Sequence, residues 1–213
     1  MTVMKKIGRL HILTDTALQS RFSHIELARL AISGGADTIQ FRHKAGPTRE
    51  MIEVAQQIKR LCTDNGVTFI VNDRVDVALA VEAEGLHLGQ DDFPISLARE
   101  LFGKDRIIGG SAATMKEAQK CISDGADYVG FGPAYPTRSK ADAGPVSGID
   151  ILKEVVDAIP IPIIAIGGID ETNAAEVMRS GAHGIAVISS VCCSDDPREA
   201  ARALSDALQQ GTL

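Results

Sequence analysis

Short apolar runs alternate with longer amphipathic segments along the chain. The apolar runs are rich in isoleucine and valine, which is typical of strands buried on both faces. Between them, apolar residues recur at three- and four-residue spacing, as in Ile25–Ile32 and Met51–Leu61, which predicts helices. Regular alternation of this kind indicates a parallel sheet. The predicted strands are Arg9–Thr14, Thr38–Phe41, Thr68–Val71, Gly85–Leu88, Arg106–Gly109, Tyr128–Phe131, Pro162–Ile166 and Gly184–Ile188.

A recurring phrase opens every second predicted strand. Its variants are Gly35-Ala-Asp-Thr-Ile-Gln, Glu84-Gly-Leu-His-Leu, Gly125-Ala-Asp-Tyr-Val-Gly and Gly181-Ala-His-Gly-Ile-Ala. We expect each variant to end a helix with a glycine in the left-handed conformation and then to start a strand. A repeated two-strand period favours an eightfold (β/α) barrel over an open doubly wound sheet, although Gly-Ala-Asp is also a common helix-to-strand turn in any α/β fold. The sequence therefore predicts one α/β domain, a (β/α)8 TIM barrel, over residues 1–213.

The bulk composition fits such a fold and argues against several kinds of partner. Apolar residues make up 45% of the 213 residues, aromatic residues make up 4%, and there is no tryptophan, so the core must be aliphatic. The net charge of -6 argues against a nucleic acid or an anionic membrane as partner. A small anionic ligand is still allowed, because it responds to local charge only. A homo-oligomer is also compatible with the sequence.

The sequence predicts a cytoplasmic protein. Met1–Lys6 carries two lysines, but no apolar stretch of the length of a secretion signal follows. The longest apolar stretch, Ile159–Ile166, contains two prolines and is too short to span a bilayer. No cysteine belongs to a C-x-x-C pair, which indicates reduced thiols. The cysteines are Cys62, Cys121, Cys192 and Cys193.

Polar clusters follow most of the predicted strands. In TIM barrels the loops after the strands form the active face, whereas the loops before them mainly stabilise the fold. We therefore expect Asp37 and Asp127, which precede strands, to be structural. The functional candidates follow strands, and they are Arg42, Lys44, Asp73, Asp92, Ser111 and Lys140.

Three polar residues at the end of the second strand predict an anion site. Gln40, Arg42 and Lys44 are two positions apart, so they point to the same side if the strand continues, with His43 opposite. Arginine makes two-pronged bonds to phosphate and lysine supplies a mobile charge. The alternative is a solvated strand end without a ligand.

Carboxylates after the third and fourth strands predict a metal site. Asp73 and Asp92 would share a Mg²⁺ ion, which accepts few protein ligands and keeps positions for phosphate oxygens and water. Asp91 is a weaker candidate, and we expect Asp76 on the following helix. The alternative for these aspartates is helix N-capping, which Asp92 before Phe93 and Pro94 would suit.

Hydroxyl- and glycine-rich segments follow the last three strands. Residues 132–148 form the longest interruption of the pattern and predict either a lid over phosphates or a disordered insertion. Gly167-Gly168 and Ser189-Ser190 follow the seventh and eighth strands, where this fold often builds a phosphate site. Asp170 and Glu171 are expected to cap the next helix, and their charge opposes a phosphate there.

The histidines and cysteines add no separate catalytic centre. His11 and His87 lie within predicted strands, so we expect them to be packed rather than catalytic. Cys192 and Cys193 follow the last strand, but nothing in the sequence positions a base beside them. We therefore expect both thiols to be buried.

Taken together, these segments resemble thiamine phosphate synthases along nearly the whole chain. Each matching piece is short, but their order and spacing are specific to that family. The pieces are Thr14-Asp15, Gln40-Phe-Arg-His-Lys44, Val71-Asn-Asp-Arg-Val-Asp76, His87-Leu-Gly-Gln-Asp-Asp92, Gly132-Pro-Ala-Tyr-Pro-Thr-Arg-Ser-Lys140, Ile166-Gly-Gly-Ile169 and Val187-Ile-Ser189.

The resemblance implies a Mg²⁺-dependent transferase acting on two small phosphorylated substrates. It would join 4-amino-2-methyl-5-hydroxymethylpyrimidine diphosphate to hydroxyethyl-thiazole phosphate, or its carboxylated form, with release of pyrophosphate. By similarity, Asp73 and Asp92 would hold the metal. The pyrimidine diphosphate would contact Gln40, Arg42, Lys44, Asn72, Ser111 and Lys140, of which Arg42, Lys44, Ser111 and Lys140 would be catalytic. The thiazole phosphate would contact Thr137, Ser139, Gly168, Ile188 and Ser189.

Two departures and two alternatives accompany the resemblance. Ala113 stands where the family often has histidine, and Ser139 stands where threonine is usual, although serine keeps the hydroxyl. A thiazole tautomerase, an isomerase relative on the same scaffold, would use that histidine and tends to lack the diphosphate and metal residues. A non-catalytic phosphate-binding barrel would have no need to keep Asp73, Asp92 and Lys140. The residues present favour the synthase.

Overall fold

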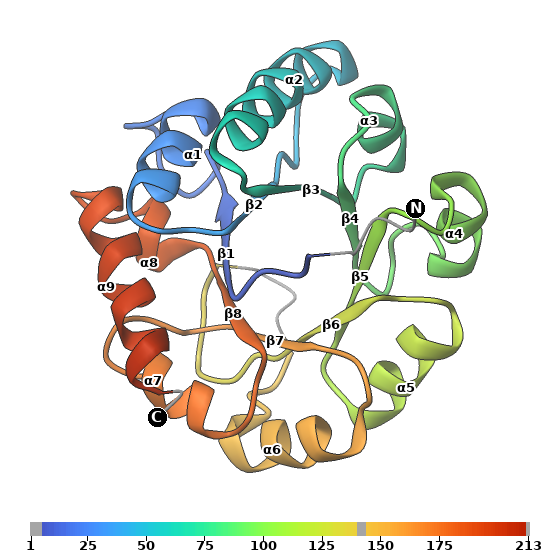
Figure 1. Ribbon diagram of the computed structural model, residues 1–213, viewed down its shortest axis with the longest axis vertical. Helices are drawn as coiled ribbons and strands as arrows, with labels where there is room; N and C mark the ends of the chain where they lie inside the picture. Colours follow the sequence, from blue (N-terminus) through green and yellow to red (C-terminus); the bar gives the residue numbers. More distant parts are fainter. Residues whose placement is uncertain (1–5, 140–143, 212–213) are drawn as a thin grey trace.

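The computed structural model describes residues 6–139 and 144–211. Eight parallel strands follow one another in chain order, and the first pairs with the last to close a barrel. Figure 1 looks along this barrel, with the helices arranged as a ring around it. The arrangement confirms the predicted TIM barrel. The strands are β1 (Leu10–Thr14), β2 (Thr38–Phe41), β3 (Thr68–Asn72), β4 (Gly85–Leu88), β5 (Ile107–Ala112), β6 (Tyr128–Phe131), β7 (Ile163–Ile166) and β8 (Gly184–Val187).

The helices cover the outside of the barrel. The predicted helical segments Ile25–Ile32 and Met51–Leu61 lie inside longer helices. A short extra helix follows β8 directly, before the final helix. The helices are α1 (His24–Ser33), α2 (Thr48–Asn65), α3 (Val75–Ala80), α4 (Ile95–Phe102), α5 (Met115–Ser123), α6 (Gly148–Ala158), α7 (Ala174–Arg179), α8 (Ser189–Cys192) and α9 (Pro197–Gln210). None of the helices in the described part of the chain is long and apolar enough to cross a membrane.

The repeated helix-to-strand phrase is only partly confirmed. Gly35, Gly125 and Gly181 follow helices with φ values of 102°, 95° and 90°, which a glycine adopts without strain. The prediction is wrong for the variant Glu84-Gly-Leu-His-Leu, because Gly85 is the first residue of β4 and Glu82 takes the positive φ of 52° instead. Gly85 is needed there for a different reason: a Cβ atom would lie 2.9 Å from Cγ1 of Ile70 on the neighbouring strand.

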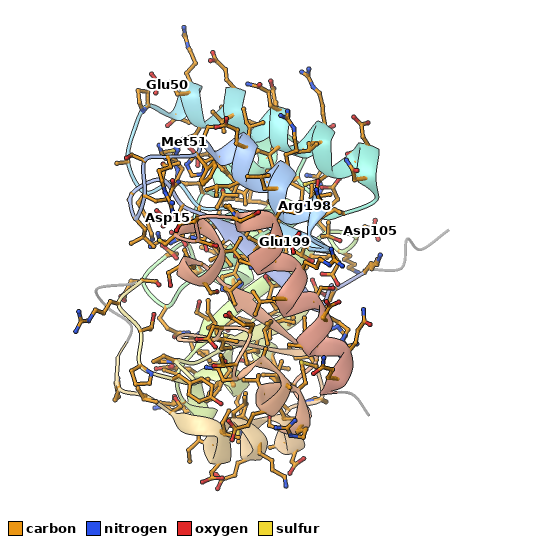
Figure 2. All side chains as sticks on the ribbon, turned by 90° about the vertical axis from the view of Figure 1, so that its left-hand side faces the viewer. Asp15, Glu50, Met51, Asp105, Arg198 and Glu199 are labelled. Carbon is orange, nitrogen blue, oxygen red and sulfur yellow. The ribbon has the colours of Figure 1, made fainter. Side chains whose placement is uncertain are left out.

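Aspartates at the starts of the strands stabilise one end of the barrel. Asp37 accepts hydrogen bonds from the backbone N–H groups of Arg9 and Leu10 at 2.9 and 3.0 Å. Asp127 accepts one from the N–H of Ile108 at 2.8 Å and pairs with Arg99. Both are structural, as predicted. Figure 2 shows the two ends of the barrel, with Asp105, which precedes β5, and Asp15, which follows β1, on opposite sides of the molecule.

The core has two parts, one between strands and helices and one inside the barrel. The outer part is aliphatic, with the exception of a few phenylalanines and small residues. The inner part includes Leu13, Ile70, Ile164 and the fully buried ring of Tyr128. A tyrosine at this depth brings a hydroxyl group that needs a hydrogen-bond partner. The barrel interior is therefore partly polar below the end where the strands finish.

Candidate functional site

A cavity of about 350 Å³ opens where the strands of the barrel end. Ten of the predicted site residues line it: Arg42, Lys44, Asp73, Asp92, Ser111, Thr137, Ser139, Gly168, Ile188 and Ser189. Gln40 and Asn72 line a much smaller cavity of about 10 Å³, which shares Ser111 with the large one. Lys140 lies outside the described residues. The structure thus brings together nearly all the candidates that it describes.

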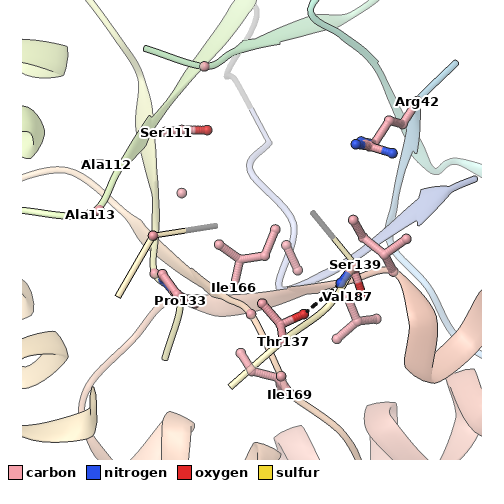
Figure 3. A pocket seen from close by; sticks show the side chains of 18 of the residues that line it. Arg42, Ser111, Ala112, Ala113, Pro133, Thr137, Ser139, Ile166, Ile169 and Val187 are labelled. Atoms are coloured by element: carbon pink, nitrogen blue, oxygen red, sulfur yellow. Dashed lines mark hydrogen bonds between the residues drawn. The ribbon is translucent and has the colours of Figure 1, made fainter. Parts of the chain in front are cut away.

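The cavity has two chemically different sides. One side carries Arg42, Lys44, Asp73 and Asp92, which follow β2, β3 and β4, together with Ser111 on β5. The other side is built from the segments after β6, β7 and β8 and offers hydroxyl groups and glycine backbone. In Figure 3, Ser111 and Arg42 lie in the upper part of the view, to the left and to the right, and Thr137 and Ile169 lie below them. We call the two sides of the cavity the charged side and the hydroxyl side.

Arg42 on the charged side is held by a buried partner. Its guanidinium forms an ion pair with Asp15, and the two residues are only 8% and 1% exposed. Asp15 Oδ1 also accepts hydrogen bonds from the backbone N–H groups of Ala17 and Leu18, at 2.8 and 3.3 Å. These bonds hold the carboxylate, and through it the arginine, in one orientation. Sequence reasoning assigned no role to Asp15, although its place directly after β1 was a signal for one.

Lys44, Asp73 and Asp92 form a connected cluster. Lys44 pairs with Asp73, whose backbone has a positive φ of 65°. Burial raises the pKa of Asp73, but the contacts with Lys44 and Asp92 outweigh burial and hold that pKa below its ordinary value. Burial, and next the contact with Asp73, raise the pKa of Asp92. Ionised Asp73 therefore disfavours the ionisation of Asp92, and a cation between the two carboxylates would relieve this.

Asp92 does not cap a helix. Its Oδ2 accepts a hydrogen bond from the backbone N–H of Gly89 at 2.7 Å, which closes the loop after β4. Helix α4 starts after Pro94, and no side chain caps it. The helix-capping alternative for this residue is therefore wrong. Asp76 lies in α3, as expected, and pairs with Arg74 there.

The hydroxyl side joins three loops. Ser139 Oγ donates to Ser189 Oγ at 2.9 Å, and the backbone N–H of Ser139 donates to Thr137 Oγ1 at 3.2 Å (Figure 3). Gly168 has a φ of 64°, and a Cβ atom there would lie 2.5 Å from the carbonyl oxygen of Pro136. Ser190 also lines the cavity, and its Oγ is buried without a hydrogen-bond partner among the described residues. These groups can donate to an anionic ligand.

The acidic residues near the hydroxyl side are placed differently from expectation. Asp170 Oδ1 accepts hydrogen bonds from the N–H and the hydroxyl of Thr172, at 2.9 and 2.6 Å. The carboxylate therefore has hydrogen-bond donors within its own turn. The N-cap of α7 is Asn173, and the prediction that Asp170 and Glu171 cap this helix is wrong. Segment 132–148 is described except for residues 140–143, and Thr137 and Ser139 place its first part beside the cavity.

Ser111 lies within a strand and not in the loop after one. Strand β5 extends to Ala112, beyond the predicted end at Gly109, because the glycines and Ser111 continue to pair with β6. The prediction that Ser111 follows a strand is therefore wrong. Ser111 Oγ is 2.9 Å from His87 Nε2. His87 and His11 are packed, as predicted, but sequence reasoning missed this contact of His87 with the site.

Ala113, which stands where histidine is frequent, lines the cavity and belongs to the start of a helix. Its backbone N–H donates to Glu117 Oε2 at 2.7 Å, beside the capping box that Thr114 and Glu117 form for α5. Its carbonyl accepts from Ser147 Oγ at 3.3 Å. Hydrogen bonds of the Ala113 backbone therefore hold this loop, and they do not involve the side chain at this position.

The thiols play no part in the cavity. Cys192 is buried, but the prediction of burial is wrong for Cys193, which is exposed because it ends the short helix α8 at the surface. Burial raises the pKa of Cys192 to about 12, so its thiol stays protonated.

Comparison with known proteins finds similarity to one family over most of the chain. The family model described as thiamine monophosphate synthase matches residues 10–191. The thiamine-phosphate synthase of Methanocella arvoryzae is 50% identical over 204 residues, which cover 96% of each chain. That of Salinibacter ruber is 49% identical over 196 residues, covering 92% of this chain and 86% of the relative.

A solved structure shows the same fold over nearly the same length. The thiamine phosphate pyrophosphorylase of Pyrococcus furiosus is 41% identical and superimposes with a TM-score of 0.89, covering 96% of this chain and 97% of that one. The chain belongs to the thiamine monophosphate synthase family and is a transferase of thiamine biosynthesis.

Proposed function

We propose that this transferase joins 4-amino-2-methyl-5-hydroxymethylpyrimidine diphosphate to hydroxyethyl-thiazole phosphate, or its carboxylated form, and releases pyrophosphate. The carbon–oxygen bond to the diphosphate breaks and its electron pair leaves with the diphosphate. The thiazole nitrogen then forms a bond to the pyrimidinylmethyl carbon, which gives thiamine phosphate. The observation that supports this reaction is that the large cavity has both a charged side and a hydroxyl side. Two anionic substrates need separate sites that face each other.

The charged side suits the diphosphate. Arg42 and Lys44 can bind its oxygens, and Arg42 Nε is buried without a hydrogen-bond partner among the described residues. Ser111 can donate to the leaving oxygen, while Gln40 and Asn72 in the smaller cavity would contact the pyrimidine. Lys140 is proposed from sequence to approach the diphosphate from the lid segment. Positive charge placed where negative charge grows stabilises the transition state more than the bound substrate.

Asp73 and Asp92 fit a Mg²⁺ ion. Their carboxylates are neighbours, and burial and then the contact with Asp73 raise the pKa of Asp92, effects that a bound cation would offset. The described residues contain no group of three histidine, cysteine or acidic side chains that could hold a metal, so the protein would supply few ligands. Mg²⁺ is the cation that tolerates this, because it keeps water and phosphate oxygens in its coordination sphere. When bound, it would neutralise charge on the departing diphosphate.

The hydroxyl side suits the thiazole phosphate. Thr137, Ser139 and Ser189 present hydroxyl groups, while Gly168 and Ile188 bring backbone close to the cavity. Backbone N–H groups and hydroxyls bind a phosphate without adding positive charge. The acceptor substrate would then lie opposite the pyrimidine, with its ring nitrogen toward the carbon that loses the diphosphate.

We also propose that the reaction takes place in the cytoplasm, with neither a nucleic acid nor a membrane as partner. Cys62, Cys121, Cys192 and Cys193 are free thiols in the structure, as expected in a reducing compartment. Both proposed substrates are small and phosphorylated.

The proposed reaction can be tested with the purified protein, both phosphorylated precursors and Mg²⁺. We expect thiamine phosphate and pyrophosphate in equal amounts, no turnover in excess EDTA, and recovery when Mg²⁺ is added back. Absence of thiamine phosphate under all conditions would reject the function. Equal turnover with and without EDTA would reject the metal while leaving the reaction in place.

A pair of matched variants tests the metal ligands. We expect Asp92→Asn to lower kcat/KM by roughly a hundredfold or more at ordinary Mg²⁺ concentrations, because one metal ligand is lost. The control is Asp76→Asn. The carboxylate of Asp76, in the first turn of α3, pairs with Arg74, and Asp76 does not line the cavity. An Asp92→Asn enzyme with the activity of the control would show that Asp92 is not a ligand.

A further inference from the structure

A chain of hydrogen-bonded side chains runs through the inside of the barrel to the cavity. It starts at the carbonyl oxygen of Gly8, before β1, and continues through His11 on β1 and Gln40 on β2. It then passes through Tyr128 on β6 and His87 on β4 and ends at Ser111 on β5. The four side chains between the two ends are at most 7% exposed. The proposed function gives no role to this series of hydrogen-bonded side chains as a whole.

The hydrogen bond between Gly8 and His11 fixes which ring nitrogen of His11 carries the proton. His11 Nε2 lies 3.1 Å from the carbonyl oxygen of Gly8, which can only accept, so Nε2 carries the proton. Burial lowers the pKa of His11 to about 4, so the ring is neutral near pH 7 and Nδ1 is an acceptor. Gln40 must therefore turn its amide nitrogen, and not its oxygen, toward Nδ1, at 3.4 Å.

The donor and acceptor of each further hydrogen bond can be assigned in the same way as far as Ser111. The second amide proton of Gln40 points to the Tyr128 oxygen at 3.4 Å, so the phenol accepts there. Burial raises the pKa of Tyr128, so the phenol keeps its proton and donates it to His87 Nδ1 at 2.9 Å. Because Nδ1 of His87 accepts this bond, the ring proton lies on Nε2, which donates to Ser111 Oγ at 2.9 Å.

We infer that this buried chain sets the hydrogen-bonding polarity of the cavity floor, with His11, Tyr128 and His87 as positioning residues. Because Ser111 Oγ accepts from His87, its own proton is directed into the cavity, where the oxygen points in Figure 3. Gln40 Oε1 is buried without a partner among the described residues and lines the smaller cavity as an acceptor. Ser111 is thus a donor for an anionic oxygen, and Gln40 is an acceptor for an N–H group. The choice of ligand for each rests on the proposed function, but the polarity does not.

Two glycines show that strands β5 and β6 leave space for the rings of Tyr128 and His87. A Cβ atom on Gly109 would lie 2.1 Å from Cζ of Tyr128, and one on Gly130 would lie 2.9 Å from Cε1 of His87. Both glycines are in strand positions, β5 and β6, where a glycine weakens the sheet. The space that they leave is filled by the two rings that connect Gln40 to Ser111.

The polarity can be measured without any substrate. Nitrogen-15 NMR of the imidazole rings in the full chain distinguishes the two neutral tautomers, and the signals can be assigned with His24→Gln, His43→Gln and His183→Gln variants. We expect His11 and His87 both to be protonated on Nε2 at pH 7.5. A proton on Nδ1 of either ring would overturn the inference.

A tyrosine variant tests the link between the chain and Ser111. Tyr128→Phe keeps the ring but removes the donor to His87, so we expect a changed His87 tautomer signal and a kcat lowered roughly tenfold, with little change in KM for the thiazole phosphate. The matched control is Tyr135→Phe, whose hydroxyl donates to Glu176 at 2.7 Å outside the cavity. An unchanged His87 signal in Tyr128→Phe would overturn the inference.

A double variant separates this inference from the proposed reaction. If Tyr128 acts through Ser111, then Tyr128→Phe should cost little further activity in a Ser111→Ala background. Fully multiplicative effects would overturn the positioning role. If the wild-type protein makes no thiamine phosphate, the proposed function fails, while the tautomers of His11 and His87 still decide the polarity.

Discussion

The ion pair between Arg42 and Asp15 is the most buried pairing of opposite charges at the cavity. An arginine that is 8% exposed has lost most of its hydration, and Asp15 compensates for this loss. The backbone bonds to Asp15 keep the carboxylate in place when no ligand is present. At the residue scale, the charged side is therefore preformed.

Replacement of Asp15 by asparagine tests this arrangement. Asp15→Asn leaves a buried guanidinium without a counter-charge, so we expect the free energy of unfolding to fall by roughly 3–5 kcal/mol. Denaturant titration measures the effect. The control is Asp195→Asn, because the pair between Asp195 and Arg21 is exposed and should contribute no more than about 1 kcal/mol. Equal losses in the two variants would mean that burial of the Arg42 pair has no energetic consequence.

At the scale of single elements, strand β5 shows how glycine shapes the barrel interior. Gly109 faces the ring of Tyr128 on β6, and the two residues are direct partners in the sheet register. The ring fills the volume that a side chain on β5 would otherwise occupy. Packing inside the barrel is thus shared between neighbouring strands, with one strand supplying the space and the other the ring.

A methyl group at Gly109 should disturb this packing. Gly109→Ala places a Cβ atom 2.1 Å from the Tyr128 ring, so we expect a loss of roughly 1–3 kcal/mol in the free energy of unfolding, measured by thermal or denaturant unfolding. The control is Gly66→Asn at the end of α2, where φ is 67° and no atom lies within 4 Å of the added Cβ. Asparagine tolerates this conformation, so the control should stay close to wild type. A Gly109→Ala protein as stable as the control would mean that the ring moves freely.

Strand β5 also shows what could and could not be predicted from the sequence. The alternation of apolar runs and amphipathic segments was enough for the barrel, and the rule that functional residues follow strands was enough to place Arg42, Lys44, Asp73 and Asp92 around the cavity. The end of β5 was misplaced because glycines and a serine resemble a turn. The contacts of His87 could not be predicted, since they involve Tyr128 and Ser111 from two other strands. Local patterns carry no information on such contacts.

At the scale of the whole molecule, buried histidines make stability depend on pH. Burial lowers the pKa of His11 and of His24 to about 4, and for His24 the nearby His43 adds to the effect. The unfolded chain binds protons at these positions near pH 6.5, whereas the folded chain does not. The unfolded state therefore gains protons as the pH falls from about 6.5 to about 4, and the folded state loses stability over that window.

Unfolding at different pH values can isolate one of these contributions. We expect the wild-type protein to lose on the order of 2–3 kcal/mol through His24 between pH 7.5 and pH 4.5. His24→Gln keeps a group that can hydrogen-bond to Thr14 and Thr16 but cannot titrate, so its stability should fall less over the same range. Parallel curves for the two proteins would contradict a depressed pKa for His24.

The charged side of the cavity comes from β1 to β5, and the hydroxyl side comes from the segments after β6, β7 and β8. Each side is therefore encoded by one continuous stretch of chain, with the boundary before Tyr128. Under the proposed function, recognition of the group donor and of the group acceptor could be altered separately, by replacing one stretch while keeping the other together with Tyr128 and Lys140. A chain shortened before β8 would keep the donor residues but could neither close the barrel nor complete the acceptor pocket. Inheritance of the site in two blocks would let new acceptors be explored while the leaving-group chemistry stays intact, as long as Tyr128 and Lys140 are kept.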